Sequence, residues 1–153
     1  MQVKKILILG IAFFSSFAIS SISCHAESSG AHPAYLHALS NLRLMRAYLD
    51  RATADERIDD ESLIAIDEID SAIHEINIAA IDDGKNLQDH PPIDLHISRT
   101  DRFNRAIEAG NTALNEIKSE DDTSLETLKH HTIDHIARAD NIIGHILEHR
   151  NRR

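Results

Sequence analysis

Apolar residues recur along most of this chain at alternating steps of three and four. That spacing places side chains on one face of an α-helix. Four stretches carry the pattern: residues 33–54, 59–82, 100–118 and 123–150. No segment of useful length alternates apolar and polar residues with the period of two that is typical of strands. The pattern therefore predicts an all-α protein folded as a four-helix bundle.

Each predicted helix has a seam of apolar positions that we expect to form the core. The seams are Ala38, Leu42, Met45, Leu49 and Ala52; Ile66, Ile69, Ile73, Ile76 and Ala80; Phe103, Ile107, Gly110, Leu114 and Ile117; and Leu125, Leu128, Thr132, Ile136, Ala139, Ile143 and Ile146. Pro33 suits the first position of a helix, and Gly84 stands where a C-terminal cap is expected after the second helix.

The connections predict two antiparallel hairpins joined by a long Pro-containing loop at 84–98. The pair Pro91-Pro92 excludes helix there. Fifteen extended residues reach ~50 Å, whereas a helix of 22 residues is only ~33 Å long. The loop can therefore cross the whole bundle or cap one end. If it caps one end, that end gathers His32, His37, Asp89, His90, Asp94, His96, His145 and His149; if it crosses, His130 and His131 join the loop instead.

Residues 1–26 have the features of a cleaved signal peptide. Lys4 and Lys5 precede an uncharged apolar run, and Cys24 and Ala26 place small residues before a predicted cleavage at Glu27. A membrane anchor would need ~20 predominantly apolar residues, and this apolar run is shorter and rich in serine near its end. Lipidation of Cys24 would need a leucine-type residue at position 21, where the chain has serine. We therefore expect export to the periplasm or beyond the cell, no membrane span after cleavage, and a single domain at 27–153.

Cleavage would leave an acidic chain without cysteine. It removes two of the 16 basic residues and none of the 25 acidic ones, so the formal charge changes from −9 to −11. Loss of the single cysteine excludes disulfides and thiolate metal sites. The excess negative charge argues against nucleic acid and anionic membranes as partners and favours cations.

The last predicted helix is rich in histidine. His131 and His135, and likewise His145 and His149, are spaced i,i+4, so each pair can present two imidazoles to one ion. Neutral imidazole suits Zn²⁺, Cu²⁺ or Ni²⁺. The alternatives are a solvated polar face and a response to pH near the ordinary pKa of histidine. His32, His37, His90, Asp94 and His96 are possible contributors from the loop end.

Two polar residues, Asp70 and Asn77, lie beside the isoleucine seam of the second helix. In an up-down-up-down bundle the second and fourth helices are parallel, and Asp70 and His135 stand at similar heights. We then expect an Asp70–His135 hydrogen bond across the core. Ile64 and Ile78 project away from the seam and are candidate anchors for a partner in the cell envelope.

No enzyme motif is present, so we expect a non-enzymatic protein. The chain has no GxSxG, no phosphate-binding glycine loop, no zincin motif and no Glu-x-x-His of the di-iron bundles. A non-covalent haem would have only Met45 and His135 as axial ligands.

Three strings, HPAYLHALSNLR (32–43), AIDEIDSAIHEI (65–76) and IDDGKNLQDHPPID (81–94), resemble a family of uncharacterised exported bacterial helical-bundle proteins. The resemblance covers most of residues 27–153 and implies a shared bundle without an assigned activity. The last helix is more loosely similar to small histidine-rich exported metal-binding proteins, which implies a divalent metal ion as partner. The alternative is an envelope interaction or structural module without metal.

Overall fold

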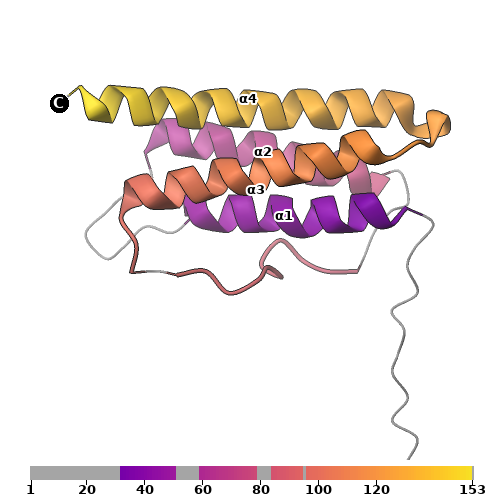
Figure 1. The fold of residues 1–153 in the computed structure, drawn as a ribbon, viewed down its shortest axis with the longest axis horizontal. Coiled ribbons are helices and arrows are strands. Elements are labelled where there is room, and N and C mark those ends of the chain that lie inside the picture. The colour runs from indigo at the N-terminus through magenta and orange to yellow at the C-terminus, as the bar shows by residue number, and fades with distance from the viewer. Residues whose placement is uncertain (1–31, 51–58, 79–83, 95, 153) are drawn as a thin grey trace, which may run out of the picture.

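The computed structural model describes residues 32–50, 59–78, 84–94 and 96–152 (Figure 1). These residues form four α-helices and no strand: α1 (Pro33–Asp50), α2 (Asp60–Ile78), α3 (Arg99–Ser119) and α4 (Glu126–Asn151), with a 3-10 turn, η1 (Thr123–Leu125), before α4. The all-α prediction is confirmed. Three predictions lie outside the described residues. They are the signal peptide, the C-terminal ends of the first two predicted helices (with Ala52 and Ala80), and the cap that joins Gly84 to α2.

Side-chain caps set the starts of α2 and α3. Asp59 accepts a hydrogen bond from the Ser62 backbone N–H at 2.8 Å and so caps α2. Ser98 accepts from the Asp101 N–H at 3.1 Å and caps α3. Such bonds satisfy N–H groups that have no partner within the helix. None of the helices in the described ranges combines the length and apolar character needed to cross a membrane.

The helices pack in a square in which α1 contacts α2 and α3, and α4 contacts the same two. Along α1 and α3, His32 lies beside Glu120 and Asn41 beside Glu116, so these two helices are antiparallel. Figure 1 shows α1 and α4 running in one direction and α2 and α3 in the other. Consequently the starts of α1 and α4 share one end, which we call the η1 end. The start of α2 and the C-terminus of α4 share the opposite end.

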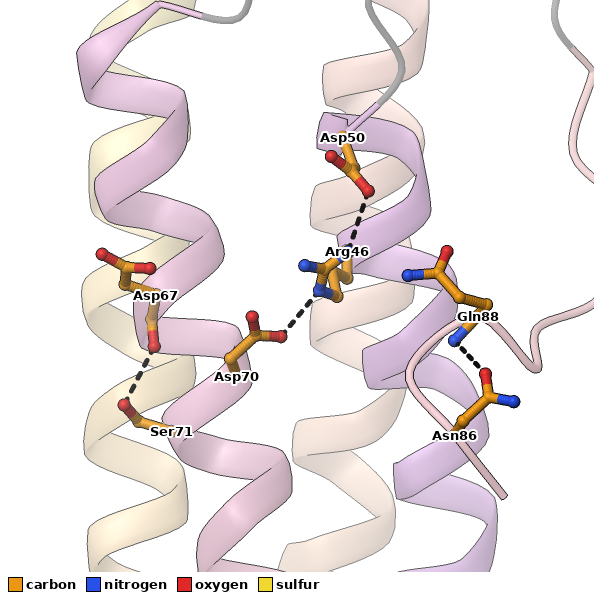
Figure 2. A network of polar contacts seen from close by, with 7 residues as sticks. All are labelled: Arg46, Asp50, Asp67, Asp70, Ser71, Asn86 and Gln88. Atoms are coloured by element: carbon orange, nitrogen blue, oxygen red, sulfur yellow. Dashed lines mark hydrogen bonds and ion pairs between the residues drawn. The ribbon is translucent and has the colours of Figure 1, made fainter.

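The described part of the segment between α2 and α3 lies alongside α1. In Figure 1 residues 84–94 and 96–98 follow the length of the helices from one end to the other. The Arg43 guanidinium donates to the Lys85 carbonyl at 3.4 Å, and Leu87 packs against the core. Within the segment the Gln88 N–H donates to the Asn86 side chain at 2.7 Å (Figure 2). Of the two routes open to this loop, the described residues follow the crossing one.

One apolar cluster fills the space between the four helices. The described seam residues of α1 and α2 are buried, and so are those of α4 from Thr132 to Ile146. On α3 the buried line differs from the predicted one, because Ala106, Ala109 and Ala113 are buried while Ile107 and Leu114 are only half-buried. Small residues on this face let α3 approach α1 closely. A Cβ at Gly110 would stand 2.9 Å from Met45 Sδ.

A polar contact joins α1 to α2 at the edge of the core (Figure 2). Arg46 donates through Nε to Asp70 Oδ1 at 2.7 Å and through Nη1 to Asp50 Oδ2 at 2.9 Å. Only 15% of the Arg46 side chain is exposed. The guanidinium thus links the two helices with charge-assisted hydrogen bonds that are partly shielded from water.

We expect Arg46→Ala to lower the free energy of unfolding by ~1–2 kcal/mol, because it removes two charge-assisted bonds and a packed side-chain stem. Denaturant unfolding at neutral pH measures this loss. A cycle with Asp70→Asn should give a coupling of ~0.5–1 kcal/mol. The control is Arg105→Ala, whose exposed pair with Glu108 should contribute less than ~0.5 kcal/mol. Equal losses at Arg46 and Arg105 would contradict the expectation.

Candidate functional site

The four histidines predicted as ligands on α4 fall into two unlike groups. His131 and His135 face α2, where His131 Nδ1 lies 3.9 Å from Glu75 Oε2 and His135 Nδ1 lies 2.6 Å from Glu68 Oε2. His145 and His149 face each other on the outer side of the last turns of α4. The same i,i+4 spacing therefore gives two different surroundings.

Glu68, His135 and Arg138 form one polar network. Glu68 Oε2 lies 2.6 Å from His135 Nδ1 and accepts a hydrogen bond from Arg138 Nε at 2.9 Å. Burial alone would raise the pKa of Glu68, but the hydrogen bonds from His135 and Arg138 and the charge of Arg138 outweigh it and lower that pKa. Arg138 Nη2 is also 2.7 Å from His135 Nδ1. Depending on the tautomer, His135 Nδ1 either donates to Glu68 or accepts from Arg138. Nδ1 of His135 is thereby committed to its neighbours.

The pair His145/His149 has the geometry of a two-nitrogen chelate. The two Nε2 atoms are 3.1 Å apart, with ring centroids 4.3 Å apart and ring planes at 70°. In the neutral pair one Nε2 donates its hydrogen to the other. Two nitrogens bound to one Zn²⁺ at ~2.0–2.1 Å with a near-tetrahedral angle lie ~3.0–3.4 Å apart. The imidazoles can therefore share an ion with little movement, and both residues are exposed.

An open pocket of about 800 Å³ adjoins this pair, at the end of the core where α2 and α3 begin. It is lined by Asp59, Asp60, Glu61, Arg99, Ile146, His149 and Arg150. Asp59 forms an ion pair with Arg99, and Arg99 lies over the ring of Phe103 at 4.9 Å. Burial would raise the pKa of Asp59, but the hydrogen bonds with Ser62 and the charge of Arg99 lower it. The pocket therefore places carboxylates near His149, with Asp59 already paired.

Two imidazoles do not complete a metal site by themselves. In the part of the chain that the structure describes, no three or more His, Cys, Asp or Glu residues are grouped so that they could hold a metal ion. Structural zinc sites have four ligands, and catalytic ones have three from the protein. Among the described residues, His145 and His149 therefore offer two potential nitrogen ligands without a third ligand-type residue grouped with them.

Of the two alternatives, the arrangement that would gather His32 and His37 with His145 and His149 at one end is not the observed one. His32 lies at the η1 end, with Nδ1 3.6 Å from Glu120 and Nε2 3.8 Å from Asp122. His37 lies 3.9 Å from Glu116. The reason is that α1 and α4 run in the same direction, so the start of one helix and the C-terminus of the other are at opposite ends.

Beside His32, the fully buried Tyr35 keeps its hydroxyl without a hydrogen-bond partner. Burial, together with the charges of Glu120, Glu126 and Asp122, raises its pKa to about 12. Tyr35 is therefore a neutral phenol at any physiological pH. It serves the core at this end and offers no anionic ligand.

The predicted loop contributors stabilise the loop itself. His90 Nδ1 is 2.7 Å from the Pro91 carbonyl, and Asp94 Oδ1 accepts from the His96 backbone N–H at 2.8 Å. Asp89 Oδ2 accepts from the Asn86 N–H at 2.9 Å. Asx-type bonds of this kind shape turns. These contacts assign His90, Asp94 and Asp89 to local turn structure.

The predicted Asp70–His135 hydrogen bond is wrong. Asp70 binds Arg46 of α1, and His135 binds Glu68 of α2. Because α2 and α4 are antiparallel, heights counted from the helix starts do not match, and Glu68 takes the place expected for Asp70. Asn77 lies at the edge of the core, where its Oδ1 is buried without a hydrogen-bond partner.

Asp140 is a perturbed residue that the sequence pattern did not single out. Its Oδ1 is buried without a partner and points toward α3, 3.0 Å from the position of a Cβ at Gly110. Burial raises the pKa of its carboxyl to about 6. A signal was available, since Asp140 stands four residues after Ile136 and so falls on the apolar face of α4. Glu68 carried no such signal, because its role depends on a neighbouring helix.

The chain matches no protein-family model, and comparisons with curated proteins and with solved structures found no similar protein. The resemblance to exported bacterial helical-bundle proteins therefore stays a prediction, and the chemistry of His145 and His149 carries the functional argument.

Proposed function

We propose that this protein is an exported, non-enzymatic four-helix-bundle protein that binds a divalent transition-metal ion through His145 and His149. The observation that carries the proposal is the 3.1 Å separation of the two Nε2 atoms on an exposed helix face. Neutral imidazole nitrogen is a preferred ligand of Zn²⁺, Cu²⁺ and Ni²⁺. The acidic balance of the chain, with 25 acidic against 16 basic residues, favours cation uptake.

The other histidine pair supports the choice by contrast. His135 Nδ1 is held by Glu68 and Arg138, which fixes the ring and leaves Nε2 as the nitrogen open to an ion. His145 and His149 contact each other instead, and a metal ion replaces only the weak bond between two neutral rings. The second pair is therefore the one whose two nitrogens already lie at chelating distance.

Calorimetric titration of the untagged protein at pH 7.5 with Zn²⁺, Ni²⁺ and Cu²⁺ tests the proposal. We expect His145→Ala/His149→Ala to weaken binding at least ~10–100-fold, because both nitrogen ligands are lost. The matched control is His131→Ala/His135→Ala, which removes an identical i,i+4 pair and should change affinity less than ~3-fold. Circular dichroism establishes that both variants stay helical.

Two results would count against the proposal. One is the absence of binding heat with all three ions, and the other is an equal effect of the two double variants. Binding should also weaken as the pH is lowered, because protonated imidazole cannot coordinate.

A second function is supported by one observation on α2. Leu63, Ile64 and Ile78 are 46%, 53% and 66% exposed, and they give this helix apolar contact points for a protein partner. An interaction module would form its complexes in the presence of a chelator. A metal-binding protein takes up its ion only when no chelator is present. Measuring complex formation and metal binding with and without the chelator therefore separates the two functions.

A further inference from the structure

We propose that His145 and His149 are half of a tetrahedral zinc site that a second copy of this chain completes, so that one Zn²⁺ joins two copies. This inference rests on the proposed metal function and adds the remaining ligands, the geometry and the stoichiometry of the site.

The first argument is the number of ligands. The pair supplies two nitrogens, and no third His, Asp or Glu stands with them in a metal-binding group among the described residues. A structural Zn²⁺ ion takes four ligands. A two-fold axis through the ion would bring the same two imidazoles from a second copy and fill the coordination sphere. Such a self-complementary contact is the commonest form of protein dimer.

The second argument is geometry. A separation of 3.1 Å between the Nε2 atoms corresponds to an N–Zn–N angle of ~100° at ordinary Zn–N lengths, close to the tetrahedral value. Four imidazoles arranged in this way suit Zn²⁺, whose structural sites are almost always tetrahedral. Cu²⁺ favours square-planar and tetragonal sites. The proposed site is therefore selective for zinc in bridging, even where other ions bind one chain.

The third argument is access. His145 and His149 are exposed, and α4 is the longest of the described helices, with a C-terminal turn that projects beyond its neighbours (Figure 1). His149 also lines the open pocket beside the starts of α2 and α3, so this ring is reached from solvent on that side too. A second α4 can therefore approach the imidazoles without rearrangement of the fold.

The fourth argument is charge. The whole chain carries a formal −9, which opposes self-association in the absence of a cation. Beside the histidines, however, Glu148 and Arg152 carry opposite charges and lie 3.9 Å apart. Two copies thus meet through a local surface of mixed charge, and the divalent ion offsets the remaining repulsion.

Sedimentation velocity of the untagged protein with increasing ZnCl₂ tests the inference. We expect a monomer in EDTA, a doubling of mass that is complete at 0.5 Zn²⁺ per chain, and reversal on adding EDTA. At a large excess of Zn²⁺ the dimer should dissociate, because each half-site then holds its own ion. X-ray absorption at the zinc edge should show four imidazole nitrogens in the dimer.

The variants separate this inference from the proposed function. His145→Ala/His149→Ala should remain monomeric at every zinc concentration, whereas the control His131→Ala/His135→Ala should dimerise as the unaltered protein does. A monomer that binds one Zn²⁺ per chain at all ratios would overturn the bridging site and leave the metal function standing. Absence of zinc binding would overturn both, and a dimer that persists in EDTA would overturn the bridging role of the ion.

Discussion

Replacing Ile69 by alanine is expected to lower the free energy of unfolding by ~2–5 kcal/mol, far more than truncation of an exposed side chain should cost. Ile69 is fully buried in the centre of α2, within the cluster shared by all four helices. Truncation removes three buried carbon atoms and leaves a cavity that a close-packed core fills only in part. A loss of this size is a large share of the stability of a domain of this length.

Ile64→Ala is the matched control for this prediction. It makes the same chemical change in the same helix, but Ile64 is 53% exposed. Its truncation opens no cavity, and alanine has the higher helix propensity, so the change should stay within ~0.5 kcal/mol. Urea unfolding followed by ellipticity at 222 nm gives both values. Similar losses at the two positions would show that α2 does not bury its isoleucine seam.

Asp140→Asn is expected to stabilise the protein by ~1–2 kcal/mol at pH 7.5. The carboxyl of Asp140 has its pKa raised to about 6 by burial, so ionisation is disfavoured in the folded state. In the unfolded chain the same group ionises near the ordinary aspartate value. Above pH 6 the folded protein must therefore hold a partly buried charge whose Oδ1 has no partner. Asparagine has nearly the same shape and removes that charge.

The sign of the pH effect follows from the direction of this shift. A raised pKa means that the folded state binds the proton more tightly than the unfolded state does. The contribution of Asp140 to stability is therefore lost as the pH rises from about 4 to about 6, and it stays at its lower value above pH 6. Below that window the lowered pKa values of Asp59 and Glu68 act in the opposite sense, and protonation of those groups destabilises the fold.

Thermal unfolding between pH 4.5 and 8 measures the effect of Asp140. The unaltered protein should lose the contribution of Asp140 between pH 4.5 and about 6.5, and Asp140→Asn should flatten that part of the profile. Asp134→Asn, an exposed substitution on the same helix, is the control and should leave the profile unchanged. A profile of Asp140→Asn that runs parallel to that of the unaltered protein would contradict the assigned burial.

The helices themselves were predictable because their signal is local. Periodicity of three and four depends only on which residues share one face of one helix, and the described seam positions of α1 and α2 are buried as expected. The prediction was less accurate on α3, where alanines and Gly110 form the buried line. Hydrophobic periodicity favours large residues, but the close approach of α3 to α1 selects small ones.

The sequence by itself determined the helical class, the acidic balance and the i,i+4 spacing that brings His145 and His149 together within one helix. Only the tertiary structure decided what surrounds each pair: Glu75 and Glu68 beside His131 and His135, and an open pocket beside His149. The physical reason is that a long loop between α2 and α3 permits α3 and α4 to run in either direction relative to α1 and α2. Both arrangements bury the same apolar faces. Direction is settled by packing between helices far apart in the chain, and it determines which charges meet.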